Sequence, residues 1–340
     1  MDESSRWPFR QRARAWLRAV SRGPGRARPK AFEAGGRRVL VMESARLSAG
    51  QTVEGFLLVR GDFSCGAGCR FLNPVYVAGA CEIGKGSTLD SVEVDGSLHL
   101  SPSVVVENNA GSLGEMDIRS GCRIGAYAWS RTSISLGLQA SARDLYAPRI
   151  ATPFGARTDA AACGLSGRPT EIPAPGATLN HGILRAGGID PRRLRPANGK
   201  TWFYDGDLHL EQTVLLRANL LVDGAFSCRP GSLLEGSVKS SGRLTLGENS
   251  VANRDLVSGG DVVLETGCIF RSEVRSSQMM RLCAGVRGLG EGKPAKAVSA
   301  GELVLEENVS VRGRLISSCR VTAAVEERAV EHRPRMAGGF

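Results

Sequence analysis

Hydrophobic positions recur every six residues over most of the chain, and they come in pairs two residues apart. One series runs from Leu208 to Val286 and is apolar at twelve of fourteen positions; its partner, from Leu210 to Leu282, is apolar at ten of thirteen. Alternation at i and i+2 is the periodicity of a strand with one buried face. The pattern therefore predicts very short strands, with a change of direction every six residues.

Glycine marks a longer repeat in both halves of the chain. The step is 18 residues, with one step of 17, in Gly61, Gly79, Gly96 and Gly114, and again in Gly206, Gly224, Gly242 and Gly260. Three short strands per repeat describe a triangular solenoid. The predicted fold class is all-β, a parallel β-helix with about 18 residues per turn, in two blocks.

Interruptions of the repeat predict the domain boundaries. We expect a basic amphipathic tail over residues 1–38, a first β-helix block over 39–150, a linker over 151–200, a second block over 201–322 and a C-terminal tail over 323–340. The linker is rich in proline, glycine and alanine, which break inward alternation, so an extended and mostly flexible segment is expected.

The energetics of a single turn predict that the terminal turns of the solenoid associate with other surfaces. A turn buries about six side chains at roughly 2 kcal/mol each, while ordering its residues costs on the order of 1–2 kcal/mol apiece, so turns must stack on one another. The terminal turns would leave unpaired strand edges and apolar core. The predicted polymerisation interface comprises Leu47, Val53, Leu57 and Val59 at one end and Leu303, Leu305, Val309, Val311 and Leu315 at the other.

The net charge of +10 is concentrated in the tail: residues 1–38 carry +8, which leaves a nearly neutral body. A neutral body offers a duplex no extended surface of phosphate contacts, so nucleic acid is not an expected partner. The nine cysteines include no Cys-x-x-Cys pair. Six of them occupy inward positions, where a thiol fills space, and we expect neither disulfides nor a metal site in a reducing cytoplasm.

The tail itself has helical periodicity, with apolar residues on one side and arginines on the other. A short amphipathic helix within residues 6–22 suits the interface of an anionic membrane, without spanning it. Partner binding and organelle targeting are the alternatives. The predicted membrane-binding residues are Phe9, Arg10, Arg14, Trp16, Leu17, Arg18 and Val20.

Catalytic residues are hard to place on this pattern. His99 and His209 each lie between two inward leucines and should point outward, while His181 falls in the linker and His332 in the C-terminal tail. The run from Gly288 to Pro294 lacks the spacing of a P-loop and predicts a protruding loop. Acidic residues that follow corner glycines are interpreted as solvated: Asp62, Asp207, Asp261 and Glu302. No catalytic, cofactor or metal residues are predicted.

The repeats that begin at Gly224, Gly242, Gly260 and Gly301, such as Gly242-Arg-Leu-Thr-Leu-Gly-Glu-Asn-Ser-Val251, resemble those of the bactofilins, polymer-forming cytoskeletal proteins of bacteria. The likeness is good over residues 201–318 and weak over 39–150. It implies a right-handed β-helix that stacks end to end into filaments without a nucleotide cofactor and often attaches to the inner face of the membrane. The two blocks and the Pro-rich middle depart from the usual short form.

These observations predict a non-enzymatic, self-assembling scaffold at the cytoplasmic face of the membrane. Its expected partners are further copies of itself, an anionic membrane surface, and other scaffold or cell-wall-associated proteins. Two alternatives remain open. One is a hexapeptide-repeat-type transferase or another β-helical carbohydrate-active enzyme, with a groove between the blocks lined by His181. The other is a monomeric solenoid adaptor whose linker covers one open end.

Overall fold

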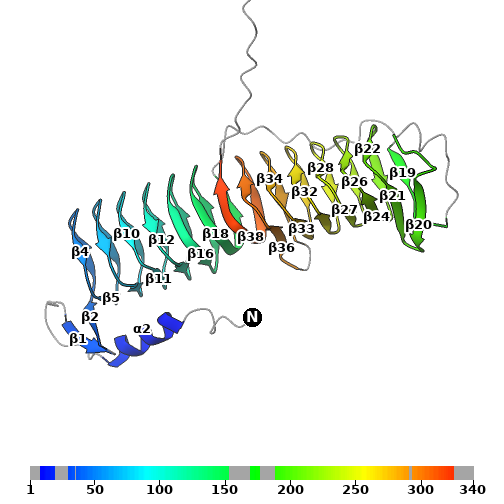
Figure 1. Cartoon of the computed structure of the whole chain (residues 1–340). Coiled ribbons are helices and arrows are strands. Elements are labelled where there is room, and N and C mark those ends of the chain that lie inside the picture. The colour runs from blue at the N-terminus through cyan, green and yellow to red at the C-terminus, as the bar shows by residue number, and fades with distance from the viewer. Residues whose placement is uncertain are drawn as a thin grey trace, which may run out of the picture.

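The computed structural model of the 340-residue chain describes residues 8–19, 30–34, 36–152, 169–176, 188–290 and 293–324. These residues form an all-β parallel solenoid of about 14 turns, with about 18 residues per turn (Figure 1). One helix, α2 (Pro8–Ala19), is present in the described part of the chain. The predicted fold is confirmed in these terms.

In the first block each turn contributes to three parallel sheets, which we call faces 1, 2 and 3. Face 1 contains β2 (Arg37–Met42), β5 (Phe56–Val59), β8 (Val75–Val77), β11 (Val92–Val94), β14 (Ala110–Ser112) and parts of β16 (Arg123–Ser130) and β18 (Ser141–Ala151). Face 2 contains β3 (Ala45–Leu47), β6 (Phe63–Cys65), β9 (Cys81–Ile83), β12 (Leu98–Leu100), β15 (Met116–Ile118), β17 (Ser133–Leu136) and the end of β18. Face 3 contains β4 (Thr52–Val53), β7 (Arg70–Phe71), β10 (Thr88–Leu89), β13 (Val105–Val106) and the first parts of β16 and β18.

The second block repeats this arrangement. Its face 1 contains β21 (Thr201–Asp205), β24 (Asn219–Asp223), β27 (Val238–Ser240), β30 (Leu256–Ser258), β33 (Glu273–Ser276), β36 (Ala295–Ser299) and the middle of β38 (Ser310–Ala323). Face 2 contains β22 (Leu208–Leu210), β25 (Phe226–Cys228), β28 (Leu244–Leu246), β31 (Val262–Leu264), β34 (Met280–Leu282), β37 (Leu303–Leu305) and the end of β38. Face 3 contains β19 (Thr170–Ile172), β23 (Val214–Leu216), β26 (Leu233–Leu234), β29 (Val251–Ala252), β32 (Ile269–Phe270), β35 (Arg287–Gly288) and the start of β38.

The core occupies the interior of the solenoid along its whole length. Inward residues of consecutive strands stack directly, as Leu244 does on Val262, and both are fully buried. The six cysteines expected on inward positions are buried and free: Cys65, Cys69, Cys81, Cys122, Cys228 and Cys268. Burial raises the pKa of the Cys65 thiol to about 11, because the ionised thiolate loses its hydration. These thiols therefore fill space in the core.

The corner between faces 1 and 2 explains the repeat of glycine. A Cβ on Gly96 would lie 2.6 Å from the carbonyl oxygen of Gly79, one turn below, and a Cβ on Gly79 would lie 2.6 Å from the carbonyl carbon of Gly61. Backbones of successive turns approach too closely there for any side chain. The glycine period is thus set by close approach of the backbone between turns.

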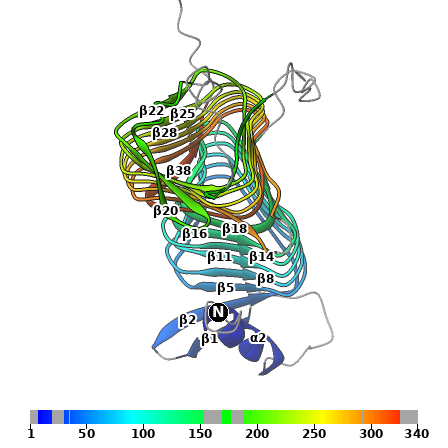
Figure 2. The ribbon, with the colours of Figure 1, turned by 90° about the vertical axis from the view of Figure 1, so that its right-hand side faces the viewer.

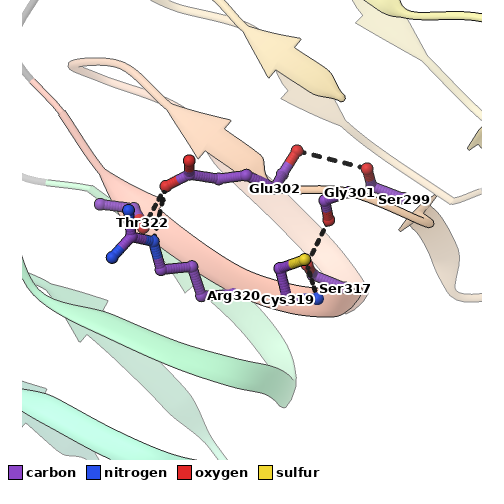
Figure 3. Close-up of polar contacts among 7 residues, drawn as sticks. All are labelled: Ser299, Gly301, Glu302, Ser317, Cys319, Arg320 and Thr322. Atoms are coloured by element: carbon purple, nitrogen blue, oxygen red, sulfur yellow. Dashed lines mark hydrogen bonds and ion pairs between the residues drawn. The ribbon is translucent and has the colours of Figure 1, made fainter. Parts of the chain in front are cut away.

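Buried serines at the end of face 1 stand beside these corners. Ser258 donates to the carbonyl oxygen of Gly242 at 2.6 Å, and Ser276 donates to that of Gly260 at 2.8 Å. In the last turn Ser317 donates to the carbonyl oxygen of Gly301 at 2.6 Å, as Figure 3 shows. Each hydroxyl satisfies a corner carbonyl of the preceding turn. Inward serines are therefore part of the repeat.

Candidate functional site

The two blocks meet end to end at their last turns. In Figure 1 the chain winds along the first block from β2 to β18, and along the second block from β21 at the far end to β38 in the middle of the rod. Strand β38 pairs with β18 in the antiparallel sense, with Leu145 opposite Leu315 and Ala142 opposite Val321. Residues of all three faces take part, because the register runs from Ser141 to Ala151. The junction therefore makes the two solenoids one continuous rod.

This junction corrects the predicted interface at the C-terminal end. The five residues expected on a free rim are at most 2% exposed and lie in the interior next to the first block: Leu303, Leu305, Val309, Val311 and Leu315. Polar contacts also join the two blocks at the junction. Thr152 donates to the carbonyl oxygen of Glu306 at 2.7 Å and accepts from the N–H of Val309 at 2.9 Å. The error arose because the sequence does not show that the blocks face each other.

The first turn of the first block is the open end of the rod. Leu47 and Val53, both predicted there, are half-buried, and Leu40 and Met42 join them as half-buried residues at the edge of the core. Leu57 and Val59 belong to the second turn and are buried, so their place at the rim was wrong. In the described part of the chain, the outer edges of β3 and β4 have no partner strand, since each pairs only with the next turn.

On face 1 the open end is extended by a strand that falls within the predicted tail. Strand β1 (Lys30–Ala34) pairs with β2 in the antiparallel sense, from Lys30 opposite Val41 to Ala34 opposite Arg37. The tail of residues 1–38 therefore contributes a strand and a helix to the fold. Antiparallel addition at a sheet edge is the same mode of pairing that joins the blocks.

The far end of the rod, by contrast, is covered by the segment predicted as a linker. Strand β19 pairs with β23, and β20 (Leu194–Asn198) pairs with β21 in the antiparallel sense. Ile172 and Ile189 are each 1% exposed, and the indole N–H of Trp202 donates to the carbonyl oxygen of Pro173 at 2.7 Å. Gly188 has a φ of +83° and passes so close to β22 that a Cβ would meet the carbonyl oxygen of His209 at 2.5 Å. The described parts of residues 151–200 are thus packed, contrary to expectation.

The predicted helix of the tail is confirmed as α2, and it lies outside face 1 below β2 and β5 (Figure 2). Ala13 and Leu17 are buried against a cluster that includes Phe56, Leu58 and Tyr76. Trp16 packs edge to face on Phe56, with ring centroids 6.0 Å apart. The apolar side of α2 therefore contacts the solenoid.

One arginine of α2 is held by the sheet as well. The guanidinium of Arg14 donates to Asp95 at 2.8 Å, and the Tyr76 hydroxyl donates to the same carboxylate at 2.5 Å. Burial, with the hydrogen bond to Asp95, raises the pKa of Tyr76 to about 12. Arg18 is exposed. Within α2, Phe9 and Arg10 have no described side-chain surroundings, and Val20 lies outside the described residues.

A shallow depression of about 830 Å³ on face 2 contains the clearest group of titratable residues. His99 Nδ1 lies 3.1 Å from Asp117, which also accepts from Arg119 at 2.9 Å. The strand register places His99 between Glu82 and Asp117, and Ser135 beyond Asp117. A serine nucleophile would have to adjoin the histidine, and in this row carboxylates flank it instead.

The remaining histidines bear on the enzymatic alternative. His209 is exposed and contacts the hydroxyl of Ser227, one turn on, at 2.7 Å. His181 and His332 lie outside the described residues. Strands β18 and β38 pair where the two blocks meet, with two register shifts, so the blocks are joined there. Among the described residues, no cluster of His, Cys, Asp and Glu is arranged to hold a metal ion.

The corner carboxylates have a role that sequence reasoning missed. Asp62 accepts from the N–H of Ala80 at 2.8 Å, Asp207 from that of Ala225 at 2.7 Å, and Asp261 from that of Met279 at 3.0 Å. Glu302 accepts from Arg320 at 2.9 Å and from Thr322 at 3.0 Å (Figure 3). They are not merely solvated, because each ties its turn to the next. The signal was their fixed position after the corner glycine.

Comparisons of the chain with protein-family models, with curated proteins and with solved structures found no match. The fold of the chain defines it as a β-solenoid. The resemblance to bactofilins stays a prediction. Within the described residues, no helix combines the length and the apolar character needed to cross a membrane.

Proposed function

We propose that this protein is a non-enzymatic, bactofilin-like scaffold that self-associates through the open first turn of its solenoid. The observation that carries the proposal is the junction, where two terminal turns join by antiparallel pairing across all three faces. The open end presents free edges on two faces, at β3 and β4 within the described chain, together with the half-buried side chains Leu47 and Val53, while β1 pairs with the edge of face 1. Removing such edges and side chains from water favours association.

The covered far end limits the assembly that this surface supports. Two copies that meet through their open ends would form a two-fold pair, since a further copy would have to displace the segment containing Ile172 and Ile189. A filament therefore requires that this cover moves. The covered end also favours the second candidate, a monomeric adaptor, which differs from the first in its oligomeric state.

Light scattering coupled to size-exclusion chromatography, with electron microscopy, separates the two candidates. The parent chain is expected to be a pair or larger, and Leu47→Glu is expected to be monomeric, because the interface would bury a charge. Ser120→Glu is the matched control, since it adds the same charge to an exposed position in the middle of the first block, away from the open end, and should leave association intact. A parent chain that stays monomeric at high concentration favours the adaptor.

Attachment to the cytoplasmic face of a membrane through α2 is the second part of the proposal. It is supported by the arginines of the helix, of which Arg18 is exposed. Because Leu17 and Ala13 are buried against the sheet, insertion of the apolar side would require α2 to detach from face 1. Membrane binding and docking of the helix on the solenoid then compete for the same side chains.

A further inference from the structure

A depression of about 540 Å³ lies across the junction on face 1 and takes its walls from both blocks. The first block contributes Trp129 and Tyr146, and the second contributes Arg314 together with Leu289 and Pro294. The last two belong to the loop that follows β35, where the sequence predicts a protrusion. The depression thus exists only because the two blocks meet.

The floor of the depression is an ordered row of outward side chains. In the strand register Trp129 lies beside Tyr146, Tyr146 is opposite Arg314, and Arg314 lies beside Lys296. Neighbouring strands are about 4.8 Å apart, so the indole and the phenol extend from adjacent strands, with Arg314 on the next strand. The guanidinium of Arg314 lies 5.7 Å from the centre of the Tyr146 ring.

The charged residues among the described lining of the depression are all positive. The depression is lined by Arg131, Lys293, Arg312 and Arg314, and none of the described residues that line it is acidic. Arg131, Lys293 and Arg312 are exposed. Positive charges close together on a concave surface raise the local concentration of anions. A bound anion reduces the repulsion between these charges. The depression therefore favours an anionic ligand.

A second depression, of about 1380 Å³, continues the first and shares Lys293 and Arg314 with it. It adds three cations, Arg254, Arg271 and Lys296, and two carboxylates.

Both carboxylates of this second depression have partners within the fold. Asp255 accepts from the hydroxyl of Ser272 and, at 3.2 Å, from the N–H of Glu273. Glu273 in turn accepts from Arg275 at 2.6 Å. The positive surface therefore extends from the junction over the neighbouring turns of the second block.

We infer that this surface binds a ligand that joins a planar ring to a phosphate, the chemistry shared by a nucleotide and a short single strand of nucleic acid. Trp129 and Tyr146 would stack on the rings, since base stacking on aromatic side chains needs no particular sequence. The guanidinium groups of Arg131, Arg312 and Arg314 match phosphate in a forked geometry. The near-neutral body still argues against a duplex, because the cations are confined to this one surface. The inference is independent of the proposed scaffold.

Fluorescence anisotropy of a labelled short oligothymidylate on the full chain tests the inference, with a nucleoside diphosphate as competitor. Trp129→Ala and Tyr146→Ala should each weaken binding about 5-fold to 100-fold. Phe203→Ala is the matched control, because Phe203 carries Arg195 over its ring at 4.5 Å away from the depression and should leave binding unchanged.

A second set of variants tests the charge of the surface. These variants change exposed side chains, so we expect them to fold like the parent chain. Arg131→Ala with Arg312→Ala should lower the slope of log affinity against log salt by roughly 1.4, or about 0.7 for each phosphate contact. Arg70→Ala with Arg243→Ala removes the same charge from exposed positions elsewhere and should leave the slope unchanged.

The outcomes separate the two sources of the ligand. Displacement of the oligonucleotide by the nucleoside diphosphate supports a nucleotide site, and binding of the strand without such displacement supports a strand site. An absence of binding by either ligand at low salt overturns the inference. So does equal binding of heparin that survives Trp129→Ala, because the surface would then select charge alone.

Discussion

Single residues at the corners decide how closely the turns stack. Gly96 stands where a Cβ would strike the backbone of Gly79, and Ser112 donates to the carbonyl oxygen of Gly96 at 2.7 Å. The corner aspartates add a third contact of this kind, from Asp62 to the N–H of Ala80. Backbone spacing, a buried hydroxyl and an exposed carboxylate thus act together at one point of each such turn.

Gly96→Ala should destabilise the fold by about 1–3 kcal/mol, because the added methyl group forces adjacent turns apart. Urea denaturation followed by circular dichroism measures the change. Gly199→Ala is the matched control, since nothing lies within 4 Å of its Cβ position and its φ is not positive. Equal midpoints for the two variants would show that close approach at the corner is not the reason for the glycine.

Buried thiols make stability depend on alkaline pH. The pKa of Cys65 is raised from 9.0 to about 11 in the folded chain, first by loss of hydration, so the unfolded chain gives up this proton more readily. The stabilising contribution is complete below pH 9 and is lost as the pH rises from 9 to 11, at about 1.4 kcal/mol per unit. Tyr76, with a pKa raised to about 12, acts in the same direction at higher pH.

Urea midpoints measured between pH 8 and pH 11 should therefore fall. Cys65→Ala should make the fall shallower, whereas Cys319→Ala, at an exposed position, should not. A parent chain with a flat profile over this range would contradict the assigned burial.

At the scale of elements, hydrophobic periodicity predicted the repeating strands correctly, whereas amino-acid composition led to a wrong prediction for the linker. The six-residue series placed the short strands from Leu208 onward, because each strand buries two residues that are two positions apart. Strands β1, β19 and β20 were missed, since they lie at the ends of the solenoid and carry no repeat. Proline content argued for a flexible linker, yet Pro173 accepts the hydrogen bond of Trp202. Such contacts depend on tertiary structure that a local pattern does not encode.

The helix α2 offers a test of the competition between sheet and membrane. Asp95→Ala removes the partner of Arg14 and should weaken docking by about 1 kcal/mol, since Arg14 is partly exposed. If α2 is a membrane anchor, binding to vesicles with anionic lipid should then rise about fivefold. Asp117→Ala, which removes an ion-paired carboxylate from face 2, away from α2, is the control.

Co-sedimentation with vesicles measures both variants against the parent chain. An increase in Asp95→Ala alone supports an anchor that is released from the solenoid. The absence of binding in all three proteins would leave α2 as a structural element of the first block and end the proposal of membrane attachment.

For the whole molecule, the direction of the second block is the feature that the sequence did not predict. Both blocks wind from an outer turn towards a shared middle, and repeats of equal period look alike whichever way a block points. The five residues predicted on a free rim at the C-terminal end point into the solenoid, but the sequence did not show that the first block lies next to them. Leu305 is 1% exposed next to β38, which pairs with the first block.

Leu305→Glu should therefore unfold the middle of the rod, at a cost of about 3–5 kcal/mol, much as Leu244→Glu should unfold the second block. Val304→Glu, whose side chain points outward from the same strand, should cost far less. Chemical denaturation with limited proteolysis compares the three. A Leu305→Glu variant as stable as the parent chain would show that the junction is not closed in solution.

Because the last turns of the two blocks meet, the described chain ends in the middle of the rod, where the N–H of Ala324 donates to the carbonyl oxygen of Leu305. The one exposed thiol among the described cysteines, Cys319, also lies in the middle of the rod. About seven turns of roughly 4.8 Å separate it from the open tip. Two rods joined tip to tip would place their two Cys319 side chains about 70 Å apart, a distance that spin labels on these two thiols would measure.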